Sequence, residues 1–409
     1  MIARVLLVHN RYQQRGGEDA VVVAEQNLLR GNGFAVELME ADNDQIVGLR
    51  GKLKASGTVF HNFSAISKLR SLLQKFRPDL VHVHNWFPSL SPAIFRTCKR
   101  ERVPVVHTIH NYRLLCAKST LFRQGAVCED CLNTTFRLPG IRHGCYRGSR
   151  SGTAVATSAI LSHWHLGTWR NCVDRFIVLS EFSRRKMEQG GLPREKISVK
   201  PNCLDFDPGA RPGNGNFFVF AGRLSEEKGV LTLLDAWRAA PHLPTLKIFG
   251  TGPEAAMVKA AASSISNVEL CGQADSTTVL NTIGNASALI CPSTWYEGMP
   301  RVVIESLAVG TPVIASRIGV YPEIITDPDF GFLFEPGNPV DLIRCASRLN
   351  DSDRLGEMRR EARAQFEKFY SAERNIQILA GIYSLVLGPK KLGETGLSLL
   401  DSQVHYSNS

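Results

Sequence analysis

The stretch FFVFAGRLSEEKGVLTLLDAW, residues 217–237, contains the pattern that decides the fold. Its first five residues form a continuous apolar run, which is typical of a strand buried on both faces of a parallel sheet. The run ends at Gly222, and apolar residues recur at helical spacing after Gly229. A strand that passes through a short turn into a helix is the repeating unit of a doubly wound α/β sheet.

The same unit recurs along the chain in two series. Amphipathic stretches of helical period lie between the apolar runs. The sequence therefore predicts an α/β protein with two Rossmann-like, doubly wound domains, and 409 residues are too many for one ordinary core but suit two. The expected strands are 3–10, 34–42, 78–85, 103–111 and 173–180 in the first series, and 217–224, 245–252, 267–272, 286–293 and 311–316 in the second.

A break in composition separates the two series. Residues 205–216 are rich in proline and glycine and show no periodicity, which indicates a linker. We therefore expect a first domain at 1–204, with a cysteine-rich insert at 116–145, and a second domain at 217–365.

The end of the chain has a helical part and a polar part. Helical periodicity covers about residues 353–387, and we expect its last portion, 366–388, to form a C-terminal helix that returns to the first domain. Residues 389–409 are polar and aperiodic, which predicts a mobile tail.

Charge is distributed unevenly between the two halves. The net charge is +10, but residues 1–200 hold 30 lysines and arginines against 15 acidic residues, whereas residues 201–409 hold 18 against 23. The first half is therefore expected to meet an anionic partner: nucleic acid, a membrane surface or a phosphorylated substrate. A basic, solvated surface is the alternative. We find no signal peptide and no apolar run long enough for a membrane span, so we expect a cytoplasmic protein.

The turn after the 217–221 run is a candidate anion site. Arg223 and Lys228 flank it, and the helix that follows begins with unpaired backbone N–H groups. A guanidinium fork and an ammonium point charge beside such groups suit a diphosphate. The alternative is a solvated turn rich in Glu and Lys.

A second candidate is EGMPRVVIE, residues 297–305, which carries a carboxylate at each end. Proline is favoured in the first turn of a helix, so the helix should begin near Pro300. Glu297 then lies in the preceding loop, and Glu305 lies about one and a half turns into the helix. The alternative is a surface glutamate and an ordinary polar helix position.

Together, these segments resemble glycosyltransferase family 4, whose members are retaining enzymes of the GT-B fold that use nucleotide sugars. The resemblance extends over about residues 2–385. One departure is Cys203, where the family pattern has glycine. The matching segments are GRLSEEKG (222–229), EGMPRVVIESLAVGTPVIAS (297–316) with its E-x7-E pattern, RGGED (15–19), TIHNYR (108–113), IVLSEFSRR (177–185) and KPNCLD (200–205).

The resemblance implies a first domain that binds the acceptor and a second that binds the nucleotide sugar, facing each other across a deep cleft. Arg223 and Lys228 would neutralise the donor diphosphate as the glycosyl bond breaks. Glu297 would contact the donor sugar, and Glu305 would accept hydrogen bonds from the ribose. The implied catalytic residues are His110, Arg223, Lys228 and Glu297, and the implied donor-binding residues are Gly16, Gly17, Gly222, Arg223, Lys228, Glu297, Gly298, Met299, Pro300 and Glu305.

The same resemblance implies a mechanism without a carboxylate nucleophile. His110 would lie by the sugar or the reacting centre, although a strand-end histidine held by the backbone is the alternative. Retention would follow from front-face attack, with the leaving phosphate helping to take the acceptor proton. Two Asp-x-Asp triplets, at 205–207 and 327–329, resemble the metal-binding triplet of the other glycosyltransferase fold. Both lie in proline-containing loops, where Asp commonly caps turns, so we do not expect them to bind a metal.

Four cysteines cluster in the insert: Cys116, Cys128, Cys131 and Cys145. A C-x2-C pair with one further cysteine on each side can supply four thiolates to a structural zinc ion. Free thiols or a regulatory disulfide are the alternatives. We expect no cofactor to be required for catalysis.

The function expected from the sequence is transfer of a hexosyl unit from a nucleotide-diphosphate sugar to a glycan or lipid-diphosphate acceptor. Exopolysaccharide, O-antigen or capsule assembly would be the setting, with peripheral contact to an anionic membrane surface and no nucleic acid partner. The alternatives are a GT-B UDP-sugar 2-epimerase, a basic nucleic-acid-binding protein, and a catalytically dead scaffold.

Overall fold

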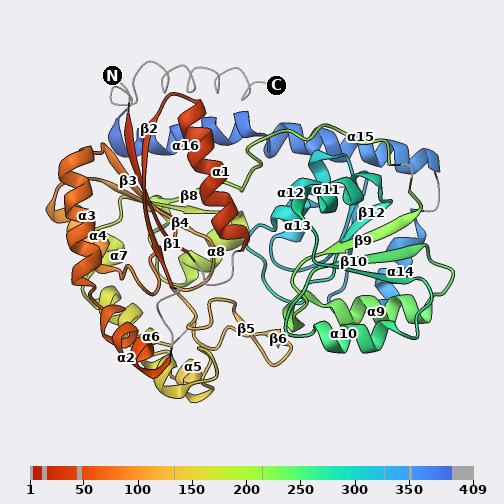
Figure 1. Ribbon diagram of the computed structural model, residues 1–409, viewed down its shortest axis with the longest axis horizontal. Helices are drawn as coiled ribbons and strands as arrows, with labels where there is room; N and C mark the ends of the chain where they lie inside the picture. Colours follow the sequence, from red (N-terminus) through yellow and green to blue (C-terminus); the bar gives the residue numbers. More distant parts are fainter. Residues whose placement is uncertain are drawn as a thin grey trace. The chain divides into compact units, whose positions relative to one another are not determined.

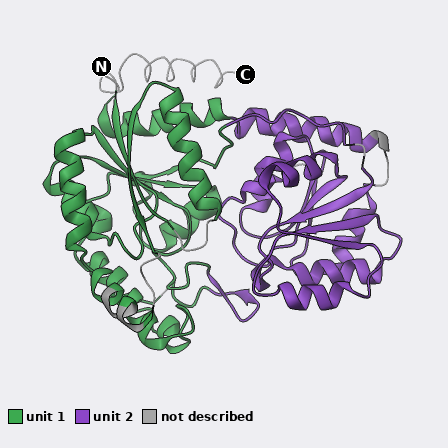
Figure 2. Ribbon diagram, in the orientation of Figure 1, with its two compact units in different colours: residues 1–120, 129–205, 372–409 green, residues 121–128, 206–371 purple. Residues whose placement is uncertain are grey.

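The computed structural model describes residues 3–11, 16–43, 48–132, 134–213, 215–326, 328–349 and 352–388. The chain divides into two compact α/β units, each with its own parallel sheet (Figures 1 and 2). Arg15 and the predicted tail at 389–409 lie outside the described residues. Unit 1 consists of Met1–Thr120, Glu129–Asp205 and Ala372–Ser409, and unit 2 of Leu121–Cys128 and Phe206–Ser371.

The sheet of unit 1 has six parallel strands in the order β2-β1-β3-β4-β7-β8. The strand order reverses between β1 and β3, which pair in the register Val5 to Leu80. The strands are β1 (Arg4–Arg11), β2 (Ala35–Asp42), β3 (Leu80–Val83), β4 (Val105–Ile109), β7 (Arg175–Val178) and β8 (Ile197–Val199).

The sheet of unit 2 also has six parallel strands, in the order β11-β10-β9-β12-β13-β14. The order reverses between β9 and β12, as in a dinucleotide-binding sheet. The strands are β9 (Phe217–Ala221), β10 (Thr245–Phe249), β11 (Val268–Gly272), β12 (Ala288–Cys291), β13 (Val313–Ser316) and β14 (Gly331–Phe334). Both doubly wound sheets predicted from the sequence are confirmed.

Helices follow most strands, and side chains cap several of them. The Asn62 side chain accepts a hydrogen bond from the Ala65 amide, and Ser180 accepts one from the Ser183 amide. The helices of unit 1 are α1 (Gly17–Gly31), α2 (Gly48–Thr58), α3 (Phe63–Phe76), α4 (Ala93–Arg100), α5 (Leu138–Arg142), α6 (Arg150–His165), α7 (Thr168–Asn171), α8 (Glu181–Gln189) and α16 (Ala372–Leu387). Those of unit 2 are α9 (Val230–Ala239), α10 (Ala255–Ala262), α11 (Ser276–Asn285), α12 (Arg301–Ala308), α13 (Tyr321–Ile324), α14 (Pro339–Ser347) and α15 (Ser352–Phe369).

The C-terminal helical stretch is divided between the two units. The single stretch predicted over 353–387 was wrong in one respect: α15 ends at Phe369, and α16 begins at Ala372. Ser371 lies in the break, and serine favours helix starts over helix interiors. The predicted return of the last helix is confirmed, because α16 packs Tyr383 and Leu379 into the core of unit 1.

Several elements were not predicted from the sequence. The strands are the three-residue β8, the four-residue β14 and a small antiparallel hairpin in the insert, formed by β5 (Phe122–Arg123) and β6 (Ala126–Val127). Each has four residues or fewer, at or below the shortest run on which a period of two can be recognised. The helices that were not predicted are α2, α5, α6, α7, α13 and α14.

Candidate active site

The candidate site in unit 2 lies in the loops that follow β9 and β12. These are the two strands between which the strand order reverses, and ligands of such sheets bind outside the carboxyl ends at that point. The two loops contact each other, because the Thr294 amide donates to the Glu227 carbonyl at 2.9 Å. Gly229 has a φ of +68°, and a Cβ there would lie 1.9 Å from the Pro292 carbonyl oxygen. Only glycine allows this close approach of the loops.

Lys228 and Glu297 form the centre of the site. The Lys228 ammonium lies 2.5 Å from Glu297 Oε1, and the Ser293 hydroxyl donates to the same oxygen at 2.9 Å. The Glu297 side chain is 7% exposed and that of Lys228 is 25% exposed. Burial alone would lower the pKa of Lys228, but the Glu297 carboxylate outweighs it and raises that pKa, so the lysine stays charged. The pair therefore presents a fixed cation at the strand ends.

Glu305 lies on the helix that follows. Helix α12 begins at Arg301, directly after Pro300, as predicted. The Glu305 carboxylate accepts a hydrogen bond from Arg301 Nε at 2.9 Å across one helical turn, and its side chain is about one-fifth exposed. Glu297 lies in the loop and Glu305 on the helix, so the two glutamates are separated as predicted from the sequence.

The remaining predicted residues of unit 2 lie in the same two loops. Arg223 is exposed, and the half-buried Gly222 precedes it at the end of β9. Gly298, Met299 and Pro300 are also half-buried, and they connect Glu297 to α12. Lys228 and Glu297 are thus in direct contact. The other predicted donor-binding residues of unit 2 belong to the same two loops or, for Glu305, to the helix that follows.

The predicted residues of unit 1 lie on that unit's own strand ends. Gly16 and Gly17 begin α1, where the Gly16 amide donates to the Asp19 carboxylate at 2.9 Å and a Cβ on either glycine would meet no atom within 4 Å. His110 directly follows β4. It lines a small pocket formed by residues 84–87, 107–111, 113 and 114.

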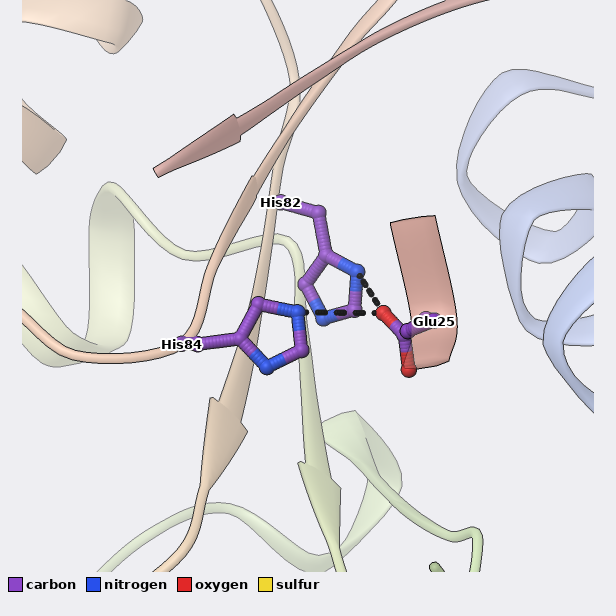
Figure 3. A group of neighbouring side chains, drawn as sticks. All are labelled: Glu25, His82 and His84. Carbon is purple, nitrogen blue, oxygen red and sulfur yellow. Dashed lines mark hydrogen bonds and ion pairs between the residues drawn. The ribbon is translucent and has the colours of Figure 1, made fainter. Parts of the chain in front are cut away.

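A buried charged cluster that was not predicted from the sequence lies beside His110. Figure 3 shows three of its members, Glu25, His82 and His84. Glu25 Oε1 lies 2.9 Å from His82 Nδ1 and 3.0 Å from His84 Nε2, and Glu25 Oε2 lies 3.0 Å from the Lys200 ammonium. His84 Nδ1 in turn lies 3.0 Å from His110 Nε2. A signal was present in the sequence, because Glu25 interrupts the apolar face of α1, and a carboxylate is rarely buried without a partner.

Two groups of side chains bear on metal binding. Within the described residues, Glu25, His82 and His84 are the one group of three or more His, Cys, Asp or Glu whose ligand atoms lie within 4.8 Å of one another. Their separations are hydrogen-bond lengths, and Lys200 already supplies the balancing positive charge, so we interpret them as an ion-pair cluster. The zinc site predicted at the four insert cysteines stays a prediction. Cys116 is buried, and Cys128, Cys131 and Cys145 are half-buried.

The first Asp-x-Asp triplet has a structural role. The Asp207 carboxylate accepts a hydrogen bond from the Gly209 amide at 2.9 Å and one from Arg363 Nη1 at 2.6 Å. These contacts cap a turn and join the segment after residue 205 to α15. In the second triplet, Asp327 lies outside the described residues.

Two family models match the chain. The model described as Glycosyltransferase Family 4 matches residues 11–208, and the model described as Glycosyl transferases group 1 matches residues 204–368. Together they span both units, and the chain belongs to glycosyltransferase family 4.

Curated relatives include characterised and uncharacterised proteins. An uncharacterised protein of the cps region of Klebsiella pneumoniae is 25% identical over 72% of this chain and 72% of that protein. An uncharacterised glycosyltransferase of Methanocaldococcus jannaschii is 28% identical over 51% of this chain. The phosphatidyl-myo-inositol mannosyltransferase of Mycobacterium leprae is 27% identical over the same share. The chain spans only 59% and 57% of the length of these last two proteins.

Solved structures share the fold. Sucrose-phosphate synthase of Thermosynechococcus elongatus aligns with a TM-score of 0.70 at 17% identity, over 94% of this chain and 98% of that chain. The Anabaena protein HepE, in complex with UDP and glucose, aligns with a TM-score of 0.64 at 18% identity, over 93% and 99%. The predicted GT-B fold class is confirmed. Among the described residues, no helix combines the length and apolar character that crossing a membrane requires.

Proposed function

We propose that this protein transfers a hexosyl unit from a nucleotide-diphosphate sugar to a glycan or lipid-linked acceptor, with retention of configuration. The observation that carries the proposal is the Lys228–Glu297 pair in the strand-end loops of unit 2. A fixed cation at this position would meet the donor diphosphate, where it stabilises the charge that develops as the glycosyl bond breaks. The UDP and glucose bound by HepE support a nucleotide sugar as donor.

The contacts of Glu297 favour a binding role over a nucleophilic one. The hydrogen bonds that described residues donate to this carboxylate, from Lys228 and Ser293, both go to Oε1. A carboxylate paired in this way is a weak nucleophile, whereas its second oxygen can accept a sugar hydroxyl. This supports a front-face mechanism in which the leaving phosphate helps to take the acceptor proton. Glu305 would accept hydrogen bonds from the ribose.

The test is a panel of nucleotide sugars and free nucleotides, with UDP included, scored by thermal stabilisation of the full chain. A ligand that binds only the folded state raises the melting temperature in proportion to the logarithm of its concentration over its Kd. We expect at least one diphosphate ligand to stabilise the protein, and Lys228→Ala to remove that effect. Stabilisation by none of them, or equal stabilisation of the variant, would contradict the proposed donor site.

The acceptor side of the proposal rests on residues 136–150 of unit 1, at the end of the cysteine-rich insert and just after it. Phe136 and Leu138 are 63% and 62% exposed, and Arg142, Arg147 and Arg150 are exposed nearby in the chain. Exposed apolar side chains among arginines suit an anionic lipid surface, which would also carry a lipid-diphosphate acceptor. The relative from the cps region of Klebsiella pneumoniae supports an acceptor in surface polysaccharide assembly.

Vesicle sedimentation tests this contact. We expect binding to vesicles that contain phosphatidylglycerol, and we expect that binding to weaken as the salt concentration rises. Phe136→Ser with Leu138→Ser should reduce binding, whereas Phe63→Ser, at a position 78% exposed elsewhere in unit 1, should not. Salt-independent binding, or equal loss in both variants, would count against the insert as the contact surface.

A further inference from the structure

The buried cluster of unit 1 makes a continuous chain of contacts that ends at His110. Glu25 projects from α1, and His84 follows β3 (Figure 3). His110 follows the neighbouring strand β4. Glu25 Oε1 to His84 Nε2 is 3.0 Å, and His84 Nδ1 to His110 Nε2 is 3.0 Å. Both ring nitrogens of His84 are therefore engaged, one by a carboxylate and the other by the histidine that lines the pocket.

The charge on Glu25 decides which way these hydrogen bonds run. Burial by itself would raise the pKa of Glu25, but Lys200, His82 and His84 outweigh it and hold the pKa well below its usual value. An ionised carboxylate only accepts, so His84 must donate from Nε2. Burial also lowers the pKa of His84 to about 4, so its other nitrogen, Nδ1, carries a lone pair and must accept.

We propose that Glu25 and His84 form a relay that fixes the proton of His110 on Nε2 and leaves His110 Nδ1 as a hydrogen-bond acceptor. Glu25 and His84 are positioning residues in this account, because they act through His110. The relay deepens the proposed function, and its consequence for catalysis rests on that function. A histidine with one fixed tautomer offers a hydroxyl of the ligand a single, preorganised partner.

Lys200 gives the relay its direction. Its ammonium lies 3.0 Å from Glu25 Oε2 and 3.0 Å from the side-chain oxygen of Asn375 on α16. An ammonium can only donate. If Gln replaced Glu25, Lys200 would attract the amide oxygen and the amide NH2 would face the histidines. His84 would then accept at Nε2 and donate from Nδ1, and the proton of His110 would move to Nδ1.

The experiment reads the tautomer directly in the full chain labelled with 15N-histidine. Long-range proton–nitrogen spectra distinguish the two neutral tautomers, and His110→Asn identifies the signals of His110. We expect an Nε2-protonated His110 in the wild type and in Glu25→Asp, and an Nδ1-protonated one in Glu25→Gln. If Glu25→Gln does not fold, His84→Phe replaces it, and we expect His110 to populate both tautomers.

Tyr383→Phe is the matched control. The Tyr383 hydroxyl lies 2.8 Å from His82 Nδ1, so this variant perturbs the same buried cluster without removing a contact of His84 or His110. We expect its His110 signals to match the wild type. A wild-type His110 protonated on Nδ1, an unchanged tautomer in the folded Glu25→Gln or His84→Phe variant, or the same change in Tyr383→Phe would each overturn the relay.

Kinetics separate the relay from the proposed function. With a donor identified, we expect Glu25→Gln to lower kcat roughly 10–100-fold, as when partners that orient metal-binding histidines are removed, and to leave the Kd for UDP unchanged. Glu25→Asp should restore most of the turnover. Wild-type protein that neither binds nucleotides nor turns over would refute the proposed function, while the tautomer spectra would still decide the relay. A normal kcat in Glu25→Gln with a changed tautomer would overturn the catalytic role of the relay.

Discussion

Each unit holds a lysine–glutamate pair beside the carboxyl ends of its sheet, and the two pairs differ in their access to solvent. In unit 2, Lys228 and Glu297 are 2.5 Å apart with side chains 25% and 7% exposed. In unit 1, Lys200 and Glu25 are 3.0 Å apart, and each is 3% exposed. We call Lys228–Glu297 the open pair, because part of its surface is accessible to a ligand. We call Lys200–Glu25 the closed pair, because within the described part of the chain its charged groups contact only other side chains of the protein. We infer that the first pair binds and the second orients.

The difference in burial has opposite energetic consequences. Removing one partner of a fully buried pair leaves an uncompensated charge away from water, which strongly destabilises the fold. Lys228 can still reach solvent when Glu297 is removed, so the fold should lose less. Activity should be affected in the opposite order. Removing a member of the Lys228–Glu297 pair should lower activity more than removing a member of the buried pair, because the Lys228 cation acts on the developing phosphate charge only when the ligand is bound.

The largest expected effect is on turnover. Lys228→Ala and Glu297→Ala should each lower kcat by roughly 10³-fold, because each removes half of the proposed diphosphate and sugar contact. Lys247→Ala is the control, since Lys247 forms a partly exposed pair with Glu269 at 3.2 Å in the same unit. Initial rates with the stabilising donor measure the effect, and circular dichroism checks the fold. Near-wild-type turnover in both site variants would refute the assignment.

The next effect is on the stability of unit 1. Glu25→Ala should lower its free energy of unfolding by about 3–5 kcal/mol, because Lys200 is left buried and unpaired. Glu25→Ala combined with Lys200→Met should recover part of that loss, since neither charge then remains. Hydrogen exchange across a urea series measures each unit separately. A double variant less stable than Glu25→Ala would contradict the buried pair as the cause.

These pairs also indicate what the sequence could and could not predict. Long apolar runs such as 217–221 are unambiguous because strands buried on both faces carry little else, and the glycine–proline corner at Gly298 and Pro300 correctly predicted the start of α12. The Lys228–Glu297 contact was expected only as two residues of one site. Their direct pairing depends on the close approach of the loops at Gly229, which the linear sequence does not express.

The closed cluster was harder to predict because its members come from distant segments. Glu25 and Lys200 are 175 positions apart, and Lys200 also contacts Asn375 from the C-terminal helix. A buried carboxylate can be suspected from its place on the apolar face of α1, but its partners follow only from the order of the strands. The roles of His110 and of the insert cysteines stay predictions for a different reason, because they depend on ligands.

Acid should weaken unit 1 before unit 2. Burial lowers the pKa of His84 to about 4 and that of His107 to about 3, and it lowers the pKa of His110 as well. Below pH 6.5 these histidines are protonated in the unfolded chain but stay neutral in the folded protein. The stability that they contribute above pH 6.5 is therefore lost as the pH falls toward their folded pKa values. In unit 2, by contrast, the histidine among the described residues, His242, is exposed.

The expected loss between pH 7 and pH 5 is about 2 kcal/mol for His84 and about the same for His107. Hydrogen exchange, corrected for the intrinsic rate at each pH, should show the protection of unit 1 falling while that of unit 2 holds. His107→Phe should reduce the slope, because His107 contacts the Val83 carbonyl through Nδ1 and its neighbours Phe95 and Phe176 are apolar. Equal acid sensitivity of both units would contradict the buried histidines as the cause.

The smallest effect concerns a third pair, which is more exposed than the other two. The Asp207 side chain is 53% exposed and that of Arg363 is 16% exposed. Both terminal nitrogens of the guanidinium, Nη1 and Nη2, donate to the Asp207 carboxylate. Asp207→Asn removes the charge but keeps an oxygen for the Gly209 amide, so the turn should persist. We expect a loss of about 0.5–1 kcal/mol for unit 2, screened by salt, because water competes for exposed charges. A loss as large as that of Glu25→Ala would show that exposure does not rank these pairs, and the distinction between the open and the closed pair would then need another physical basis.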